Sequence, residues 1–259
     1  MTLSADNVTV RAGDATLLDG IDVDVVPGEL TVVLGPNGAG KSTLVSALAG
    51  DRRPDAGVVR LAETPLEHIP LQRQAELRAV IGPPVALAFD FTTTDVVAMG
   101  WVHGERFGAR AREEAVEDVL ARCELAPLRD RVYMTLSSGE RQRVQFARGL
   151  LQIWRLPGDS TPRWLLLDEP TSNLDIAHAL GLLDALKEEA RCGVGVLAIV
   201  HDLDLGVRYA DRIVLLAGGR VVAAGAPESV MTRERLTEVY GTPVLVEHNP
   251  TLGRLTVLT

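Results

Sequence analysis

The sequence predicts an α/β fold built on a mostly parallel sheet, with antiparallel strands near the N-terminus and a helical insertion in the middle. The first observation is a set of continuous apolar runs with the length of buried strands: 30–34, 164–167, 195–200 and 213–216. The second is that helical patterns lie between these runs: 43–49, 175–190 and 203–210. Buried strands that alternate with helices indicate a parallel sheet covered on both faces.

Short strands joined by turns open the chain. We expect strands at Val8–Val10 and Ile21–Val25, because turn pairs follow each of them, at Gly13-Asp14 and Pro27-Gly28. Gly57–Leu61 is expected to add a further short strand. Since short turns join antiparallel neighbours, these strands predict an antiparallel β subdomain beside the parallel sheet.

The middle of the chain lacks convincing strands over residues 92–151. It carries helical periodicity in three places: 94–100, 111–122 and 138–151. We therefore expect a single domain over residues 1–259, with a core made of 1–91 and 152–259 and a helical subdomain at about 92–151.

The remaining segments give weaker signals. Residues 66–80 are mixed, and Ala79–Ile81 is expected to be a strand ended by Gly82-Pro83-Pro84. Leu156–Pro162 is rich in turn-forming residues and predicts a surface loop. The C-terminal part is expected to contain a strand, a short helix and a tail, in this order: 219–224, 227–240 and 243–258.

Bulk properties exclude several classes of protein. The 259 residues are 46% hydrophobic and 24% charged, which is an ordinary globular balance. A net charge of −9 argues against nucleic acid as the main partner, because phosphate backbones are bound by basic surfaces. Cys123 and Cys192 have no paired spacing, so we expect free thiols rather than a disulfide framework or a zinc site. We also expect no signal peptide and no membrane span, which leaves docking through a partner as the route to a membrane.

A phosphate-binding loop is the most specific motif. It follows the apolar run 30–34 and leads into a helical segment, which is the context that the pattern G-x-x-x-x-G-K-[ST] requires. Its residues are Gly35, Pro36, Asn37, Gly38, Ala39, Gly40, Lys41, Ser42 and Thr43. The glycines let backbone N–H groups point at phosphate oxygens, and the helix adds its positive end. Lys41 is expected to reach the β- and γ-phosphates, and Ser42 to ligate Mg²⁺.

Two further strands end in polar residues at the sheet edge where ligands bind in open α/β folds. The run 164–167 is followed by Asp168 and Glu169. Asp168 is suited to hold the Mg²⁺ of a nucleotide, and Glu169 to orient or deprotonate an attacking water. His201 follows the run that ends at Val200, so its imidazole is expected near the γ-phosphate. The plainer alternatives are an Asp-Glu-Pro cap and a histidine that meets solvent.

A hydroxyl-rich turn opens the helical pattern at 138–151. It contains Ser137, Ser138, Gly139 and Glu140. Its N–H groups and the Ser137 hydroxyl can hold a phosphate, although an ordinary helix N-cap with a nearby Glu explains the same residues. The segment Ser172–Asp175 follows the acidic pair as a fifth element.

Taken in their order along the chain, which is the phosphate loop, residues 137–140, Asp168-Glu169, Ser172–Asp175 and His201, the five elements resemble the ATP-binding-cassette (ABC) ATPases, a class of phosphate-loop NTPases, over nearly the whole chain. The resemblance implies ATP and Mg²⁺ as ligands, with Lys41, Glu169 and His201 catalytic and with Ser42 and Asp168 on the metal. It also implies a head-to-tail homodimer in which residues 137–140 of one chain bind the nucleotide held by the other. ATP then closes the dimer, and hydrolysis opens it.

Additional segments are similar to the ATPase subunit of bacterial haem importers: 87–92, 143–148, 162–172, 201–216 and 240–254. The resemblance implies a translocase at the cytoplasmic face of the membrane, bound to two copies of a permease and served indirectly by a substrate-binding protein. Ferric-siderophore and cobalamin importers share much of the pattern and remain alternatives. Further alternatives are a non-transport cassette ATPase, such as an iron–sulfur assembly type, and a nucleotide-binding regulator with little hydrolysis.

Three positions depart from the family pattern. The family's metal-contacting Gln aligns with Pro83, which has no amide to offer, and Gln72 or Gln74 would replace it only if the alignment shifted. The aromatic residue that stacks on adenine aligns with Val10, so we expect weak base recognition. Ser138 stands where a glycine is usual, which a turn accepts if its φ is negative.

Overall fold

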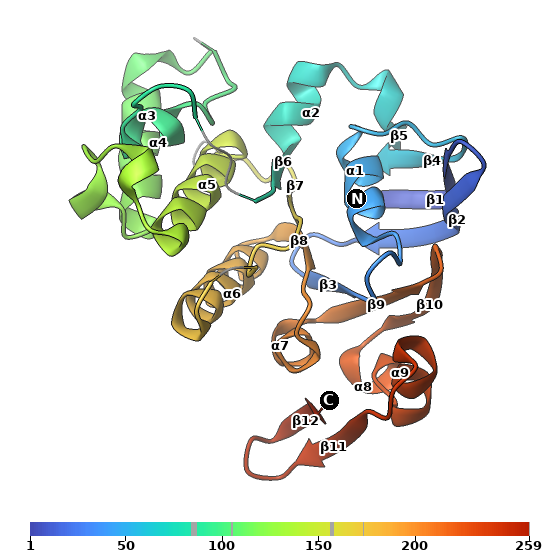
Figure 1. Ribbon diagram of the computed structural model, residues 1–259. Coiled ribbons are helices and arrows are strands. Elements are labelled where there is room, and N and C mark those ends of the chain that lie inside the picture. Colours follow the sequence, from blue (N-terminus) through green and yellow to red (C-terminus); the bar gives the residue numbers. More distant parts are fainter. Residues whose placement is uncertain (84–86, 105, 156–157, 173, 259) are drawn as a thin grey trace.

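The computed structural model describes residues 1–83, 87–104, 106–155, 158–172 and 174–258 (Figure 1). A six-stranded sheet forms its centre, with the strand order β10-β9-β3-β8-β7-β6. These strands are β3 (Leu30–Leu34), β6 (Arg78–Ile81), β7 (Arg163–Leu167), β8 (Val194–Ile199), β9 (Arg212–Ala217) and β10 (Arg220–Gly225). All neighbours are parallel except β10, which runs antiparallel to β9. The predicted mostly parallel sheet is confirmed.

A second, antiparallel sheet has the order β2-β1-β4-β5. Its strands are β1 (Leu3–Ala12), β2 (Ala15–Val25), β4 (Ala56–Leu61) and β5 (Thr64–Pro65). The expected antiparallel subdomain is therefore present, and β1 and β2 are longer than the apolar runs indicated. The extra length of β2 is residues 15–20, where Ala15 and Thr16 are exposed and Leu18 is buried, so this part of the strand has no continuous apolar run.

Helices cover both sheets. They are α1 (Lys41–Ala49), α2 (Leu71–Leu77), α3 (Thr93–Ala98), α4 (Gly108–Arg122), α5 (Ser138–Gln152), α6 (Ile176–Arg191), α7 (Leu203–Tyr209), α8 (Pro227–Val230) and α9 (Arg233–Tyr240). Short 3₁₀ helices are formed by residues 66–68, 126–128 and 133–135. Helices α3, α4 and α5 pack on one another and lie apart from the antiparallel sheet in Figure 1. This arrangement matches the helical insertion that the sequence predicts.

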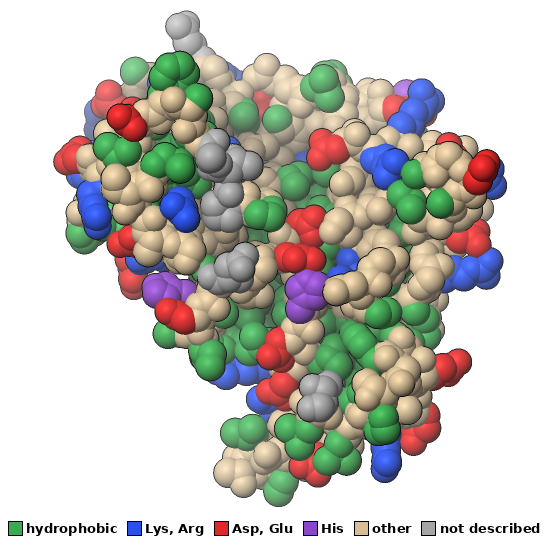
Figure 2. Space-filling view, in the orientation of Figure 1, with side chains coloured by type: hydrophobic (Ala, Val, Ile, Leu, Met, Phe, Trp, Pro, Cys, Tyr) green, Lys and Arg blue, Asp and Glu red, His purple; other side chains and the backbone are tan. Residues whose placement is uncertain are grey.

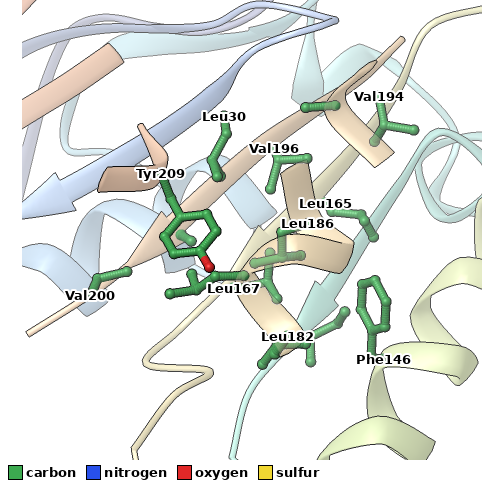
Figure 3. Close-up of a cluster of buried hydrophobic side chains, with 14 of the residues drawn as sticks. Leu30, Phe146, Leu165, Leu167, Leu182, Leu186, Val194, Val196, Val200 and Tyr209 are labelled. Carbon is green, nitrogen blue, oxygen red and sulfur yellow. The ribbon is translucent and has the colours of Figure 1, made fainter. Parts of the chain in front are cut away.

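Two apolar cores lie on opposite faces of the central sheet. Because successive side chains of a strand point to opposite faces, Val32 and Leu34 join one core and Val33 joins the other. The first core packs the sheet against α5 and α6, as Figure 3 shows for Leu165, Leu167 and their neighbours. The second packs it against α1 and the antiparallel sheet. A sheet buried on both faces explains why its strands are continuous apolar runs.

The structure defines the elements of the mixed segment 66–80 and corrects two expectations for the C-terminal part. The mixed segment 66–80 contains a 3₁₀ turn, α2 and the start of β6, and the single helix expected at 227–240 is two helices, α8 and α9. The tail is a hairpin of β11 (Leu245–Asn249) and β12 (Arg254–Leu258). Arg254 fixes this hairpin by donating from its two terminal nitrogens to the carboxylate of Asp204, at 3.0 and 2.8 Å. Of the loop expected at 156–162, residues 156 and 157 lie outside the described residues.

Candidate nucleotide site

The phosphate loop links β3 to α1 with backbone angles that favour glycine. Gly35, Gly38 and Gly40 have φ values of +148°, +78° and +100°. A Cβ at Gly35 would lie 2.1 Å from the Leu216 carbonyl oxygen, and one at Gly40 would lie 2.7 Å from that of Leu17. A Cβ at Gly38 would meet nothing within 4 Å, so the loop is open on that side. The backbone angle favours glycine at all three positions, and close packing requires it in addition at Gly35 and Gly40.

Lys41 lies folded against this loop. Its Nζ donates to the carbonyl oxygens of Gly35 at 2.8 Å and Pro36 at 3.0 Å, and the residue is only 6% exposed. Burial lowers the pKa of Lys41, while the carboxylates of Glu169 and Asp168 oppose that shift. A buried ammonium in a loop that is open at Gly38 is suited to anionic oxygens.

Ser42 and Asp168 form an oxygen pair at the end of β7. The Ser42 hydroxyl donates to Asp168 Oδ1 at 3.0 Å. Burial raises the pKa of Asp168, and the hydrogen bond from Ser42 acts against that rise. The backbone N–H of Asp168 donates to the Ile81 carbonyl at 3.0 Å, which ties the end of β7 to β6. A hydroxyl and a carboxylate in contact are the donor set that Mg²⁺ takes in nucleotide sites, so these residues fit the expected metal.

Glu169 has an unusual backbone and a close partner. Its φ is +52°, in the left-handed region that non-glycine residues rarely occupy. Its carbonyl accepts from the Ser172 N–H at 3.1 Å and from the Ser172 hydroxyl at 2.7 Å, and these bonds hold the turn. Its Oε1 lies 2.7 Å from His201 Nε2, so the ends of β7 and β8 bring the two side chains together. Figure 2 shows acidic side chains and a histidine gathered at the centre of this face.

The hydroxyl-rich turn is the N-terminus of α5. The Ser137 hydroxyl accepts from the Glu140 N–H at 3.2 Å, and the Glu140 carboxylate accepts from the Ser137 N–H at 2.7 Å. This capping box lowers the pKa of Glu140, chiefly through the bond from the Ser137 backbone. Ser138 is the first helical residue and has no positive φ, which is the condition that a serine needs there. A Cβ at Gly139 would lie 2.8 Å from the His178 ring.

The turn at residues 137–140 and the phosphate loop belong to different parts of the fold. Helix α5 packs against α3, α4 and β6, and Figure 1 shows it apart from α1. The predicted loop and sheet-edge residues therefore form one cluster, while residues 137–140 do not join it within this chain. Of the segment Ser172–Asp175, residue 173 lies outside the described residues, and Asp175 is the N-cap of α6.

The glutamines near Pro83 do not replace the missing amide at the site. Gln72 donates to the Val102 carbonyl at 2.8 Å. Gln74 donates to the Leu66 and Ile69 carbonyls at 2.8 and 2.7 Å. Both side chains lie on α2, where they link neighbouring segments of backbone. Pro83 itself is exposed just after β6, and residues 84–86 lie outside the described residues.

One contact with the loop was not predicted. Tyr240, at the end of α9, lies beside the loop: burial raises the pKa of its hydroxyl to about 12, and the backbone of Gly35 acts against that rise. No local pattern links a tyrosine near the C-terminus to the phosphate loop, so only the fold reveals it. Val10 is fully buried in the second core, which agrees with the expectation that it does not stack on a base.

Comparison with known proteins identifies the class. A family model described as "ABC transporter" matches residues 18–172, and the chain belongs to this family of ATP-hydrolysing cassette proteins. Proteins named hemin import ATP-binding protein HmuV are 44% identical in Hahella chejuensis and 43% in Bordetella parapertussis. The first alignment covers 97% of each chain, and the second covers 100% of this chain and 99% of the relative.

Solved structures agree with this fold. CbiO1 from Clostridium perfringens, part of the ABC transporter complex cbiONQ, has a TM-score of 0.77 at 25% identity and covers 91% of this chain and 92% of its own. A chain of an inward-facing ABC transporter has a TM-score of 0.82 at 24% identity, covering 99% of this chain and 96% of its own. No helix within the described part of the chain is long and apolar enough to cross a membrane.

Proposed function

We propose that this chain is the ATPase subunit of an importer that takes up haem through a partner permease. The observation that carries the proposal is identity of 41–44% to proteins named hemin import ATP-binding protein, over at least 94% of this chain. The nucleotide site supports the ATPase part of the proposal. The cargo rests on relatedness, because nothing in this chain touches it in the proposed scheme.

The phosphate loop would bind the triphosphate of ATP. Its open N–H groups and the positive end of α1 would receive the phosphate oxygens. Lys41 would exchange its bonds to the Gly35 and Pro36 carbonyls for bonds to the β- and γ-phosphates. Ser42 and Asp168 would hold Mg²⁺, which neutralises charge on the phosphates when it is bound.

Glu169 would act as the general base toward the attacking water, and His201 would position the Glu169 carboxylate. The 2.7 Å contact between Glu169 Oε1 and His201 Nε2 keeps the carboxylate at the sheet edge beside Ser42 and Asp168. The strained turn at Glu169, held by Ser172, aims the side chain rather than leaving it free. His201 would also contact the γ-phosphate, in keeping with its place at the end of β8.

The turn at residues 137–140 would complete the site of a second chain. It cannot serve the loop of its own chain in this fold, yet it presents the N-terminus of a long helix, which favours anions. A two-fold homodimer would bring it to the partner's nucleotide. Mixing Lys41→Ala chains with Gly139→Asp chains tests this, since each variant alone has two damaged sites and the mixed dimer has one intact site. Recovered hydrolysis on mixing supports the dimer, and none refutes it.

The proposed complex contains two copies of a permease, and a substrate-binding protein delivers haem to it. This chain would lie on the cytoplasmic face of the membrane. Ferric siderophore or cobalamin is the nearest alternative cargo, and a cassette ATPase outside transport is the alternative class. Co-expression with the permease separates the two classes: the importer subunit sediments with membranes until detergent extracts the permease. A chain that stays out of the membrane fraction contradicts the proposal.

A further inference from the structure

A cleft of about 520 Å³ lies between the helical insertion and α6; Gly139 of the turn at residues 137–140 lines it, and the phosphate-loop and sheet-edge residues described above do not. Its volume is within the ~300–1,000 Å³ typical of small-molecule pockets. One wall comes from α5 and the end of α4, including Phe146 and Cys123. The other wall is α6, where small residues recur every four positions at Ala177, Gly181 and Ala185 and therefore share one face.

The α6 wall is open rather than filled. A Cβ added at Gly181 would meet nothing within 4 Å, although its neighbour Leu182 is buried against the core. Most of the surface lining the cleft is apolar. The space therefore suits the hydrocarbon part of a ligand.

Polar groups at this cleft lack partners. Gln142 is 4% exposed, and its Nε2 has no hydrogen-bond partner. The Nε of Arg143 is also buried without one, while its NH1 is 3.6 Å from a Glu124 carboxylate oxygen. An unpaired buried donor is costly, so an acceptor that reaches Gln142 would be favoured. Gln142 lines the cleft although its Nε2 is buried, and rotation about the last side-chain torsion, which exchanges Nε2 with Oε1, is the movement that would present its donors to a ligand.

The charge of the lining selects the sign of the ligand. Two residues with guanidinium groups, Arg122 and Arg143, and one with a carboxylate, Glu124, line the cleft. Arg122 is paired with both Glu189 and Asp118, whereas Arg143 has only the 3.6 Å contact with Glu124, so Arg143 and Gln142 are the groups best placed to receive a ligand. Both are donors, and a carboxylate supplies acceptors and negative charge together.

We propose that this cleft binds a small amphipathic carboxylate. Its carboxylate accepts from Gln142 and Arg143, and its apolar tail lies along the open face of α6 at Gly181. Because Gly139 and His178 also line the cleft, a ligand there links the start of α5 to α6 and fixes the turn at residues 137–140 relative to the core. The proposal concerns ligand binding and does not depend on the cargo of the transporter.

Octanoate is the probe, and octanol, which lacks the charge, is its matched control. Calorimetric titration of the full chain should show saturable octanoate binding at least about tenfold tighter than octanol, the difference expected for one charge-assisted hydrogen bond. Gln142→Met keeps the volume of the side chain and removes its donors. It should weaken octanoate binding by about tenfold while leaving the affinity for octanol unchanged. Replacing an unpaired buried amide with an apolar group is not expected to unfold the chain.

Gly181→Leu provides the second variant. The new side chain enters open space on a regular helix, so it should fill the cleft and abolish binding of both compounds without loss of folding. Glu188→Leu, on the same helix but outside the cleft, is the control and should bind octanoate normally. Equal affinity for octanoate and octanol, no saturable octanoate binding, or unchanged octanoate binding by both cleft variants would overturn the proposal.

Discussion

Replacing Glu169 with Gln should stop turnover while leaving the site assembled. The change removes the charge and keeps the size of the side chain. The turn depends on the Glu169 carbonyl, which accepts from Ser172 at 3.1 and 2.7 Å, and those bonds are to the backbone and remain. The side chain is 35% exposed, so folding stability should change by less than about 0.5 kcal/mol. The proposed general-base assistance should disappear, and such assistance is worth about 10²–10⁴-fold, or about 3–5 kcal/mol of activation free energy.

The assay is phosphate release at saturating ATP and Mg²⁺, with nucleotide retention measured on the same samples. Glu169→Gln should lose at least about a hundredfold in kcat and retain bound ATP. Glu188→Gln, an exposed carboxylate on α6, is the control and should keep the full rate. If Glu169 and His201 act as a pair, the double variant with His201→Ala should lose less than the two single losses combined. A Glu169→Gln rate within about tenfold of the unaltered chain would refute the assignment of the base.

Further predictions concern the phosphate loop, the N-cap of α5, recognition of the nucleotide base and the two thiols. Gly40→Ala should abolish nucleotide binding in equilibrium dialysis, because its Cβ would lie 2.7 Å from a carbonyl oxygen; wild-type affinity would contradict this. Ser137→Ala should lower the free energy of unfolding, measured in urea, by about 1 kcal/mol, because α5 loses its N-cap. An unchanged unfolding midpoint would show that this cap does not stabilise the chain. With Val10 buried, ATP and GTP should be hydrolysed with similar KM, and a strong ATP preference would reveal another base contact. Burial raises the pKa of Cys123 to about 12, so at pH 8 iodoacetamide should modify the exposed Cys192 alone, and two modified thiols in the folded chain would contradict this burial.

The sequence predicts best what is encoded locally. The phosphate loop, the strand ends at Asp168 and His201 and the cap at Ser137 each depend on a few adjacent residues, and the structure places them in the expected elements. The buried strands were visible because a sheet covered on both faces needs continuous apolar runs. Their relative order in the sheet could not be read from the runs alone.

What escaped prediction depends on contacts between distant segments. The C-terminal hairpin alternates weakly in polarity and is held by the Arg254–Asp204 pair rather than by its own pattern. The approach of Tyr240 to the Gly35 backbone brings the end of α9 to the phosphate loop. The positive φ of Glu169 reflects the bonds from Ser172, which no propensity for Glu would indicate.

The central claim is that ATP hydrolysis by this chain drives haem uptake. The most direct test is ATP-dependent uptake into proteoliposomes that contain this chain with its co-purified permease, comparing haem with a ferric siderophore. Haem uptake should occur and should disappear with Glu169→Gln, and such a result would also show that Pro83 permits coupling. Uptake of the siderophore alone would overturn the assignment of haem as the cargo. Absence of any uptake despite normal hydrolysis would contradict the transport function.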